Sequence, residues 1–409
     1  MPATSELNTL IQDENLGIHY QPIVSLKQNG VVGLEALARP GSRPGLPQLN
    51  VLQMFEMARQ EGRLLDLDRL CRRKALGTFN AMPQLEPPKP LLFINIEASV
   101  IDQGVVGSGS IAQAVEAAGL KPCDVVLEIN ESRVIDTAAL RRFVDHHRDL
   151  AFLIALDDLG AGESNLPRVA TLRPHILKLD RSLVQDIDTD YFKQETFKSL
   201  VGLGHRTGCV ILAEGVESQA EVDTCAALGA ELFQGFFFSR PLAPEKVDFE
   251  ALAPAVNAAA RRLRETAVAA IHDRRSQAQK MRRLSDAIRG TLTFADAAQY
   301  DGLLAGLVLS ETDLECAYML DREGVQITAT HTQAGAQGQA NRLFAPSPKG
   351  SDHSHKVYFY SLIDGGLERY TTELYLSRLS GNHCRTVASL VHRRDGTKLV
   401  LCLDMKANS

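Results

Sequence analysis

The stretch Ala151-Phe152-Leu153-Ile154-Ala155-Leu156-Asp157-Asp158 decides which fold the sequence predicts. Such an apolar run is typical of a strand buried on both faces of a parallel sheet, and the following Leu159-Gly160-Ala161-Gly162 indicates a tight loop. Side chains alternate along a strand, so the two carboxylates either point apart or bind one cation together. A hard cation such as Mg²⁺ or Mn²⁺ would remove the cost of placing two carboxylates beside a core. Taken alone, the pair is explained better as a cap for the next helix.

The same pattern, an apolar run that ends in a polar side chain, recurs along the chain. It begins with two runs, Ile18–Val24 and Val31–Leu37, whose Asn29-Gly30 connection predicts a hairpin. Segments with helical spacing separate the later runs, as expected of repeated β/α units. The polar residues at the predicted strand ends are Glu35, Asn95, Glu128, Asp157, Lys178, Glu214 and Gln234. An open sheet would spread them along an edge, whereas a (β/α)8 TIM-like barrel gathers them at one face, so we predict this α/β fold.

Composition limits the class of protein. A chain of 409 residues is long enough for two or three domains, and a net charge of -6 argues against a general nucleic-acid binder. No apolar run is long enough to cross a membrane, and residues 1–15 lack the apolar segment of a signal peptide. The seven cysteines show no metal-binding spacing. We therefore expect a cytoplasmic protein with reduced thiols, no membrane insertion and no nucleic-acid polymer as partner.

The composition changes after Pro241-Leu242. Residues Leu252–Arg289 are rich in Ala and Arg and predict a long helix. Its basic side chains are typical of a membrane or nucleic-acid surface, but we favour a solvated helix that links two domains. The expected domains are a barrel over 1–250, a linker helix over 251–290 and a smaller α/β domain over 291–409.

The last domain carries four predicted strands and one pair of histidines. The strand candidates are Cys316–Leu320, Gly324–Thr330, Thr386–Leu390 and Leu399–Leu403. His353 and His355 suggest a metal, but the polar sequence around them favours a solvated loop.

The strand-end residues of the barrel suggest a chemistry. Glu35, Asn95, Glu128 and Asp157 offer oxygen ligands for one metal, and Asp158 and Glu214 would complete the site of a second. Two metals that share a carboxylate suit in-line hydrolysis of a phosphodiester, because they activate water and neutralise phosphate charge. Lys178 would then orient the water or help to activate it. In isolation, Lys178 and Asp180 are better explained as a salt bridge on the barrel rim.

Taken in order, these motifs resemble the EAL domain, a cyclic di-GMP phosphodiesterase module of bacterial signalling. The resemblance covers residues 14 to 245, and its motifs are Gln21-Pro22-Ile23, Glu35-Ala36-Leu37 with Arg39, Asn95, Glu128-Ile129-Asn130-Glu131, Asp157-Asp158-Leu159-Gly160, Lys178-Leu179-Asp180, Ala213-Glu214-Gly215-Val216-Glu217 and Gln234-Gly235. It implies a barrel whose first strand is antiparallel and metal-dependent hydrolysis of cyclic di-GMP to linear pGpG, with two Mg²⁺ or Mn²⁺ ions.

The resemblance also implies roles for individual residues. The implied metal ligands are Glu35, Asn95, Glu128, Asp157, Asp158 and Glu214, and Lys178 lies at the catalytic water. The implied substrate contacts are Gln21, Glu35, Leu37, Arg39, Asp180 and Gln234. Glu131 is implied to hold the loop after Asp158, and Glu217 to support the catalytic site.

One loop departs from the family pattern, which usually reads DDFGTGYSS. This chain has Leu159 for Phe, Ala161 for Thr, Glu163 for Tyr and Asn165 for the last Ser. The metal ligands and the lysine are all kept, whereas the loop that couples the metal site to the dimer interface is altered. The alternative to an active enzyme is therefore a weak or inactive cyclic di-GMP receptor that signals to a partner.

The C-terminal part resembles a PAS/Cache-like sensor, on the stretches Lys356–Tyr360, Tyr370–Tyr375 and Thr386–Ser389 and the Asp395-Gly396 turn. The resemblance implies an unknown small ligand or partner, or a dimerisation role. We expect a homodimer whose activity the C-terminal domain regulates.

Overall fold

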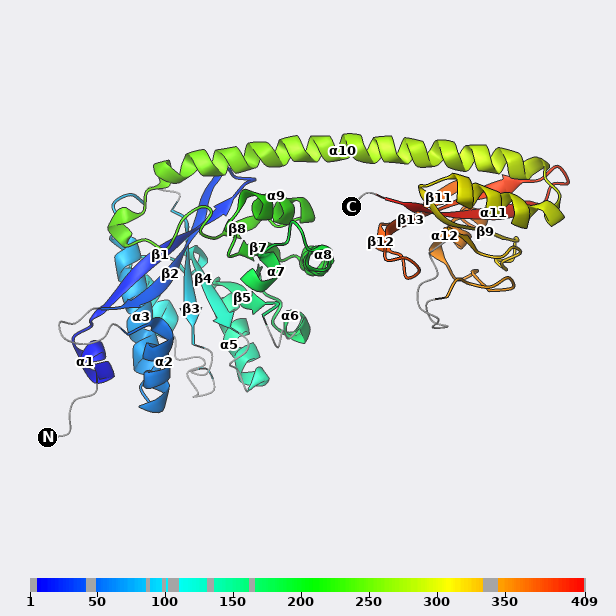
Figure 1. Cartoon of the computed structure of the whole chain (residues 1–409). Helices are drawn as coiled ribbons and strands as arrows, with labels where there is room; N and C mark the ends of the chain where they lie inside the picture. The colour runs from blue at the N-terminus through cyan, green and yellow to red at the C-terminus, as the bar shows by residue number, and fades with distance from the viewer. Residues whose placement is uncertain are drawn as a thin grey trace. The chain divides into compact units, whose positions relative to one another are not determined.

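The computed structural model describes residues 6–41, 49–85, 89–97, 101, 110–130, 136–161, 166–333 and 345–407. The chain divides into two compact units, residues 1–267 and 268–409. Helix α10 (Phe249–Phe294) continues through the division, so it belongs to both units (Figure 1). No helix in the described part of the chain is both long and apolar enough to cross a membrane.

The first unit is a closed barrel of strands in chain order. Its strands are β1 (Leu16–Ser25), β2 (Gly30–Pro40), β3 (Leu91–Ile96), β4 (Val125–Asn130), β5 (Leu153–Leu159), β6 (Ile176–Leu179), β7 (Val210–Glu214) and β8 (Leu232–Gln234). Strand β1 pairs antiparallel with both β2 and β8, and the remaining neighbours are parallel. The predicted barrel with an antiparallel first strand is therefore confirmed.

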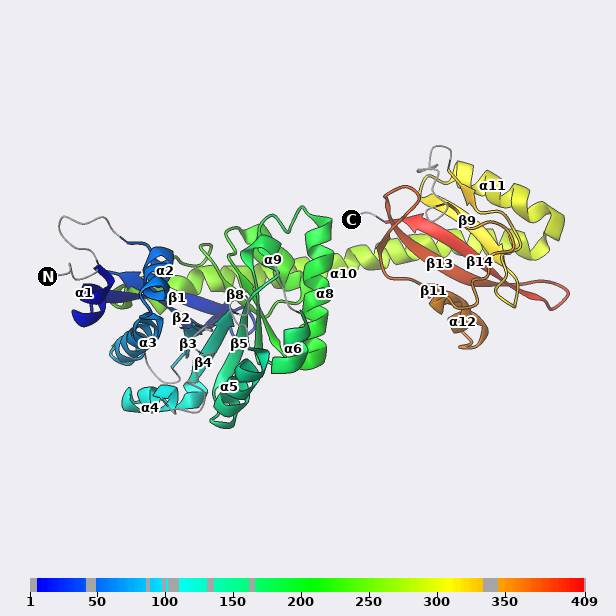
Figure 2. The same ribbon diagram turned by 90° about the horizontal axis from the view of Figure 1, so that it is seen from below.

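Helices pack around the outside of the barrel (Figures 1 and 2). They are α1 (Glu6–Gln12), α2 (Val51–Gln60), α3 (Leu64–Asn80), α4 (Ser110–Ala117), α5 (Thr137–Asp149), α6 (Leu166–Leu172), α7 (Arg181–Val184), α8 (Tyr191–Thr207) and α9 (Gln219–Leu228). Short polar residues fix where several of them begin. Asp136, for example, accepts hydrogen bonds from the first-turn amides of α5, and Asp190 does the same for α8. These caps position the helices that cover the strands.

The interior of the barrel consists of an apolar layer with a polar layer above it. Ile23, Phe93, Val126, Ala155, Ile176 and Leu212 form the apolar layer. The polar residue two positions further along a parallel strand faces the same interior, as in the pairs Val126 and Glu128 or Ile176 and Lys178. The apolar layer closes the barrel beneath the polar one, so the polar side chains are held over a packed floor.

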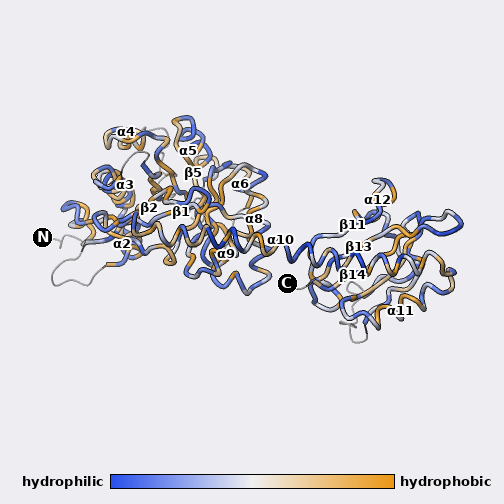
Figure 3. Tube along the Cα trace, turned by 90° about the horizontal axis from the view of Figure 1, so that it is seen from above, coloured by the Kyte–Doolittle hydropathy of each residue, from blue (hydrophilic) through white to orange (hydrophobic). Residues whose placement is uncertain are grey.

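Helix α10 packs on each unit with a different part of its length. Leu252, Val256 and Ala259 are buried at the barrel, and Ile288 and Leu292 are buried in the second unit. The basic side chains between Arg261 and Arg283 are exposed, and this part of α10 is hydrophilic in Figure 3. The predicted long helix is confirmed, and its role as a solvated link between two domains stays a prediction.

The second unit is a six-stranded sheet in the order β10-β9-β14-β13-β11, with β12 also paired to β13. The strands are β9 (Leu314–Leu320), β10 (His331–Thr332), β11 (Arg369–Thr371), β12 (Tyr375–Leu376), β13 (His383–His392) and β14 (Lys398–Lys406), and their pairings are antiparallel. Helix α11 (Tyr300–Ser310) and the end of α10 cover one face, and α12 (Val357–Ile363) covers the other (Figure 2).

Two predictions for this unit are wrong. Gly324–Thr330 is not a strand, because Gly324 turns the chain at a φ of 88° and only isolated bridges at Val325 and Gln326 follow. His353 does not lie in a solvated loop, since only 6% of it is exposed. Its ring nitrogens lie 3.0 Å from the Tyr358 hydroxyl and from Gln326 Oε1.

We predict that Gly235→Ala destabilises the barrel by about 3 kcal/mol or more, because an added Cβ would overlap the backbone nitrogen and oxygen of Val216. Gly77→Ala is the matched control, since a Cβ at this exposed position of α3 meets no atom within 4 Å and should stabilise the helix by up to about 1 kcal/mol. Thermal and urea unfolding measure both, and equal stability of the two variants would contradict the close packing at Gly235.

Candidate functional site

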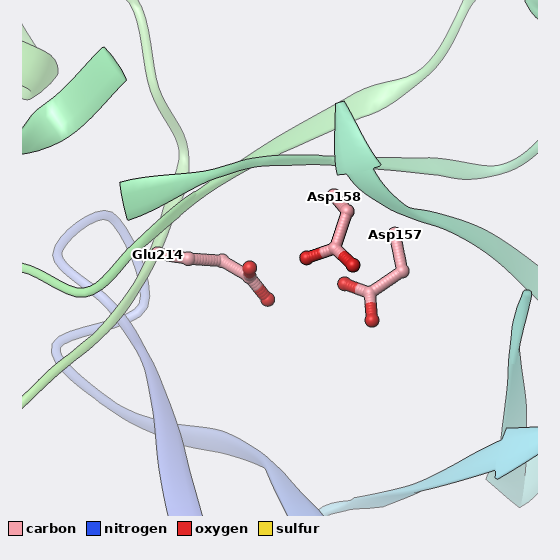
Figure 4. Close-up of side chains that lie close together, drawn as sticks. All are labelled: Asp157, Asp158 and Glu214. Atoms are coloured by element: carbon pink, nitrogen blue, oxygen red, sulfur yellow. The ribbon is translucent and has the colours of Figure 1, made fainter. Parts of the chain in front are cut away.

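A bulge at the end of β5 brings its two carboxylates to the same side. The pairing of β5 with β6 shifts register between Leu156 and Leu159, and Asp158 has a φ of 57°. Regular alternation would point Asp157 and Asp158 apart, and a bulge re-aims one of them. Oxygens of Asp157, Asp158 and Glu214 consequently lie within 4.8 Å of one another, and Glu214 points toward the pair from β7 (Figure 4).

Lys178 is the centre of the polar layer. Its Nζ lies 2.6 Å from Glu128 Oε1, 2.7 Å from Glu214 Oε1, 2.9 Å from Asp157 Oδ1 and 3.9 Å from Glu35 Oε1. Only 1% of Lys178 is exposed, and Glu128 is completely buried. One ammonium group therefore faces several carboxylates, of which Glu128 is fully buried and Asp157 and Glu214 are partly exposed.

The pKa shifts reflect this imbalance of charge. Burial raises the pKa of Glu128 well above its usual value, and the negative charge of Glu35 adds to the effect. Burial also raises the pKa of Glu214 to about 8, against the attraction of Lys178. Burial opposes the charged form of Lys178, but the surrounding carboxylates raise its pKa well above the usual value. The pKa of Asp158 is raised by burial and by Asp157. The site therefore carries more carboxylates than its one lysine can neutralise.

Amide side chains hold the carboxylate of β2 in place. Asn95 Nδ2 donates to Glu35 Oε1 at 3.0 Å, and Gln234 Nε2 donates to Glu35 Oε2 at 2.5 Å and to Gln21 Oε1 at 3.2 Å. Although burial opposes it, the charge of Lys178 and these amides lower the pKa of Glu35. Gln21, Glu35, Asn95 and Gln234 thus form one connected group.

A cleft of about 290 Å³ opens beside this group. Glu35, Leu37, Arg39 and Asn95 line it, so it is adjacent to the carboxylates and carries a cation. Arg39 Nη1 donates to the carbonyl oxygen of Ala38 at 2.8 Å, and burial lowers its pKa. The cleft is therefore open space next to the carboxylates, with Arg39 at its wall.

Three residues of the site were missed in the sequence. Asn130 lines the cleft and donates from Nδ2 to Asp158, and it is half-buried. Asp68 and Arg72 form a buried ion pair on α3 at the cleft wall, and Asp68 Oδ1 accepts from the backbone N–H of Glu97 at 3.2 Å. Asp68 and Arg72 are four residues apart within an apolar helix face, and this spacing was the signal in the sequence that could have revealed the pair.

The remaining predicted residues lie outside the buried cluster or outside the described residues. Asp180 caps α7 by accepting from the Ser182 N–H at 2.9 Å, and its charge helps to raise the pKa of Asp158. Glu217 is exposed and pairs with Arg181 at 3.0 Å. Glu131 belongs to the part of the chain that the structure does not describe.

The cluster fits divalent cations. Both oxygens of Glu128 and Oδ1 of Asp157 are buried without a partner in hydrogen-bonding geometry among the described residues, although Lys178 lies close to both side chains. Carboxylate and amide oxygens are the ligands that Mg²⁺ and Mn²⁺ prefer. A divalent cation would neutralise the excess negative charge of the carboxylates. The kind of ligand atom and the charge of the site therefore both favour a divalent cation.

Comparison with known proteins assigns the barrel. The family model described as "EAL domain" matches residues 4–241. Among curated relatives, the cyclic di-GMP phosphodiesterase RocR of Pseudomonas aeruginosa is 31% identical over 255 residues, which are 60% of this chain and 62% of RocR. The chain spans as little as 27% of the length of other curated relatives that it matches.

Solved structures show the same fold. The YkuI protein of Bacillus subtilis, solved with cyclic di-GMP and calcium, matches with a TM-score of 0.77 at 21% identity and covers 100% of both chains. The manganese and cyclic di-GMP complex of Klebsiella pneumoniae BlrP1 matches with a TM-score of 0.50 at 30% identity over 56% of each chain. YkuI therefore shares the fold of the whole chain, and BlrP1 shares the fold of about half of it.

We predict that divalent cations bind more tightly as the pH rises from about 6 to 8. Glu214, whose pKa is raised to about 8, holds a proton below that pH, and a cation must displace it. The same shift makes the metal-free protein lose stability as the pH rises from 4.5 toward 8, because the unfolded chain ionises first. Calorimetry with Mn²⁺ in two buffers of different ionisation enthalpy counts the protons released.

Glu214→Gln is the control for this prediction, since a glutamine has no proton to release. It should lower the proton count and flatten the pH dependence. An Mn²⁺ affinity that stays constant between pH 6 and 8 in the wild-type protein would contradict the raised pKa.

Proposed function

Since the chain belongs to the EAL domain family, we propose that it hydrolyses one phosphodiester of cyclic di-GMP to give linear pGpG, with Mg²⁺ or Mn²⁺ as cofactor. The observation that carries the proposal is the excess of buried carboxylates around Lys178. The names of RocR and of the BlrP1 complex support the same substrate.

In this proposal the polar layer holds two divalent cations. Their ligands are Glu35, Asn95, Glu128, Asp157, Asp158 and Glu214. When bound, the cations supply Lewis acidity, which activates water and stabilises negative charge on the phosphate. The bulge at Asp158 and the convergence of Asp157 with Glu214 support a shared site.

The chain's own residues bind and orient the substrate and the water. Lys178 has three N–H donors and no acceptor, so it orients the attacking water by donating to its oxygen and stabilises the phosphate charge. Arg39 binds a phosphate of the substrate from the wall of the cleft. Gln21, Leu37, Asp180 and Gln234 contact the substrate. Glu217 supports the catalytic site, and Glu131 holds the loop after Asp158.

We predict that the purified full-length protein converts cyclic di-GMP to pGpG with Mn²⁺ and that Glu35→Ala lowers kcat/KM by about a thousandfold or more, because metal ligands act as a unit. Chromatography of the products measures both. Glu116→Ala is the control, since Glu116 is an exposed residue of α4 and should leave the rate unchanged. No pGpG from micromolar wild-type enzyme would contradict the proposal.

A cyclic di-GMP receptor is the second candidate, and the altered loop favours it. Leu159, Ala161, Glu163 and Asn165 replace the usual residues, and residues 162–165 lie outside those that the structure describes. A receptor would bind cyclic di-GMP without turnover. In that case, Ala161→Thr together with Glu163→Tyr should restore measurable hydrolysis.

We propose further that the protein is a homodimer and that residues 268–409, a PAS/Cache-like domain, regulate the barrel. We predict that a chain ending at Ala267 stays folded but differs from the full chain in turnover or in dimer dissociation. We end the truncated chain at Ala267 and not at the expected domain boundary of residue 250, because Leu252, Val256 and Ala259 are buried at the barrel. Turnover and ultracentrifugation measure the difference, and identical values for both proteins would argue against regulation.

A further inference from the structure

One face of the C-terminal sheet changes from apolar to polar along the strands. Leu390, Val400 and Leu320 lie side by side on β13, β14 and β9 and pack beneath α12. Four residues away on each strand, and therefore on the same face, Thr386, Asp404 and Cys316 form another row. A cavity of about 500 Å³ lies over this second row. The size is ordinary for a small-molecule site.

Hydroxyl and imidazole groups converge on the cavity. The hydroxyls of Tyr318 and Tyr358 are 3.0 Å apart, and Tyr358 is also 3.0 Å from Nδ1 of His353. The other ring nitrogen of His353 lies 3.0 Å from Gln326 Oε1, and burial lowers the pKa of His353. The Tyr375 hydroxyl lies 2.9 Å from Thr386 Oγ1. Hydrogen bonds among these groups hold them in position.

Asp404 is the acidic group of the cavity, and it has no cationic partner among the described residues. Thr386 Oγ1 donates to Asp404 Oδ1 at 2.7 Å, and the Cys316 thiol contacts Oδ2 at 3.1 Å. Burial raises the pKa of Asp404 despite these donors. Glu315, by contrast, is held by Ser380, Asn382 and Cys384, and its pKa is lowered. Both carboxylates therefore have hydrogen-bond donors within the fold, Tyr375 being a further donor to Asp404, but of the two only Asp404 lines the cavity.

Two cations line the same cavity. Lys356 and Arg378 are exposed, and within the described ranges neither forms an ion pair. An apolar ligand would leave Asp404 and the hydroxyls without partners. An anion alone would face Asp404, and a cation alone would face Lys356 and Arg378. Only a ligand that carries both a positive and a negative charge pairs with Asp404 and also with Lys356 and Arg378.

We propose that this cavity binds a small zwitterion of the class of a free α-amino acid, with its ammonium group on Asp404 and its carboxylate on Lys356 and Arg378. A carboxylate and an arginine fork form two parallel hydrogen bonds, and an ammonium donates to the free lone pairs of Asp404. The site belongs to the second unit, so it can be occupied whether or not the barrel hydrolyses cyclic di-GMP.

The test uses the full-length protein and each of the twenty L-amino acids separately, at up to 10 mM. We expect at least one to raise the unfolding temperature of the protein and to give a saturable heat of binding. Its N-acetyl form and its amide should each bind at least about tenfold more weakly, since each lacks one charge. No binding by any of the twenty, or equal binding of the N-acetyl form, would overturn the proposal.

Matched variants test which side chains bind the ammonium group of the ligand and which bind its carboxylate. Asp404→Asn should weaken binding at least about tenfold, whereas Asp395→Asn, at the exposed turn before β14, should leave it unchanged. Lys356→Ala with Arg378→Ala should weaken it similarly, with the exposed Lys398→Ala as control. The double variant changes exposed side chains only, so it keeps the test valid if Asp404→Asn fails to fold. Unchanged binding in the double variant would overturn the proposal.

Discussion

The burial of one lysine among several carboxylates is the constraint on which the barrel's polar layer depends. Lys178 lies within 3 Å of Glu128, Asp157 and Glu214, and the apolar layer beneath them leaves Glu128 fully buried and the other two only partly exposed. One positive charge cannot neutralise this set, and unpaired buried carboxylates are costly. The same imbalance that costs stability provides a reason to bind cations, so the stability and the chemistry of the site have one origin.

The barrel builds this site by repeating one local rule. Each of the strands β3 to β8 places an apolar residue in or against the floor and a polar residue two positions further along, and closure of the barrel turns these separate strand ends into one cluster. The rule has one exception at β5, where the bulge brings Asp158 beside Asp157. Two neighbouring carboxylates can then face one cation, which a regular strand does not allow.

The barrel and most of its site could be predicted from the sequence because each strand carries its own signal. The apolar run before Lys178, for example, is recognisable from neighbouring residues alone. Closure of the barrel then brings the strand ends together. Features that depend on distant partners could not be predicted. The spacing of Asp68 and Arg72 indicates an ion pair, but only the position of α3 against the cleft places that pair at the site, and His353 is buried because Gln326, 27 residues away along the chain, reaches it. Gly324–Thr330 has the composition of a strand, but after the turn at Gly324 it forms only isolated bridges and no continuous pairing with another strand.

The central claim is that the polar layer holds two divalent cations at once, and counting bound Mn²⁺ by electron paramagnetic resonance tests it most directly. In the presence of cyclic di-GMP, the account predicts two Mn²⁺ ions per chain with magnetic coupling between them, because the carboxylates that would hold them lie close together. Asp157→Asn should abolish the coupling. A single uncoupled ion in the wild-type protein, or none, would contradict the account.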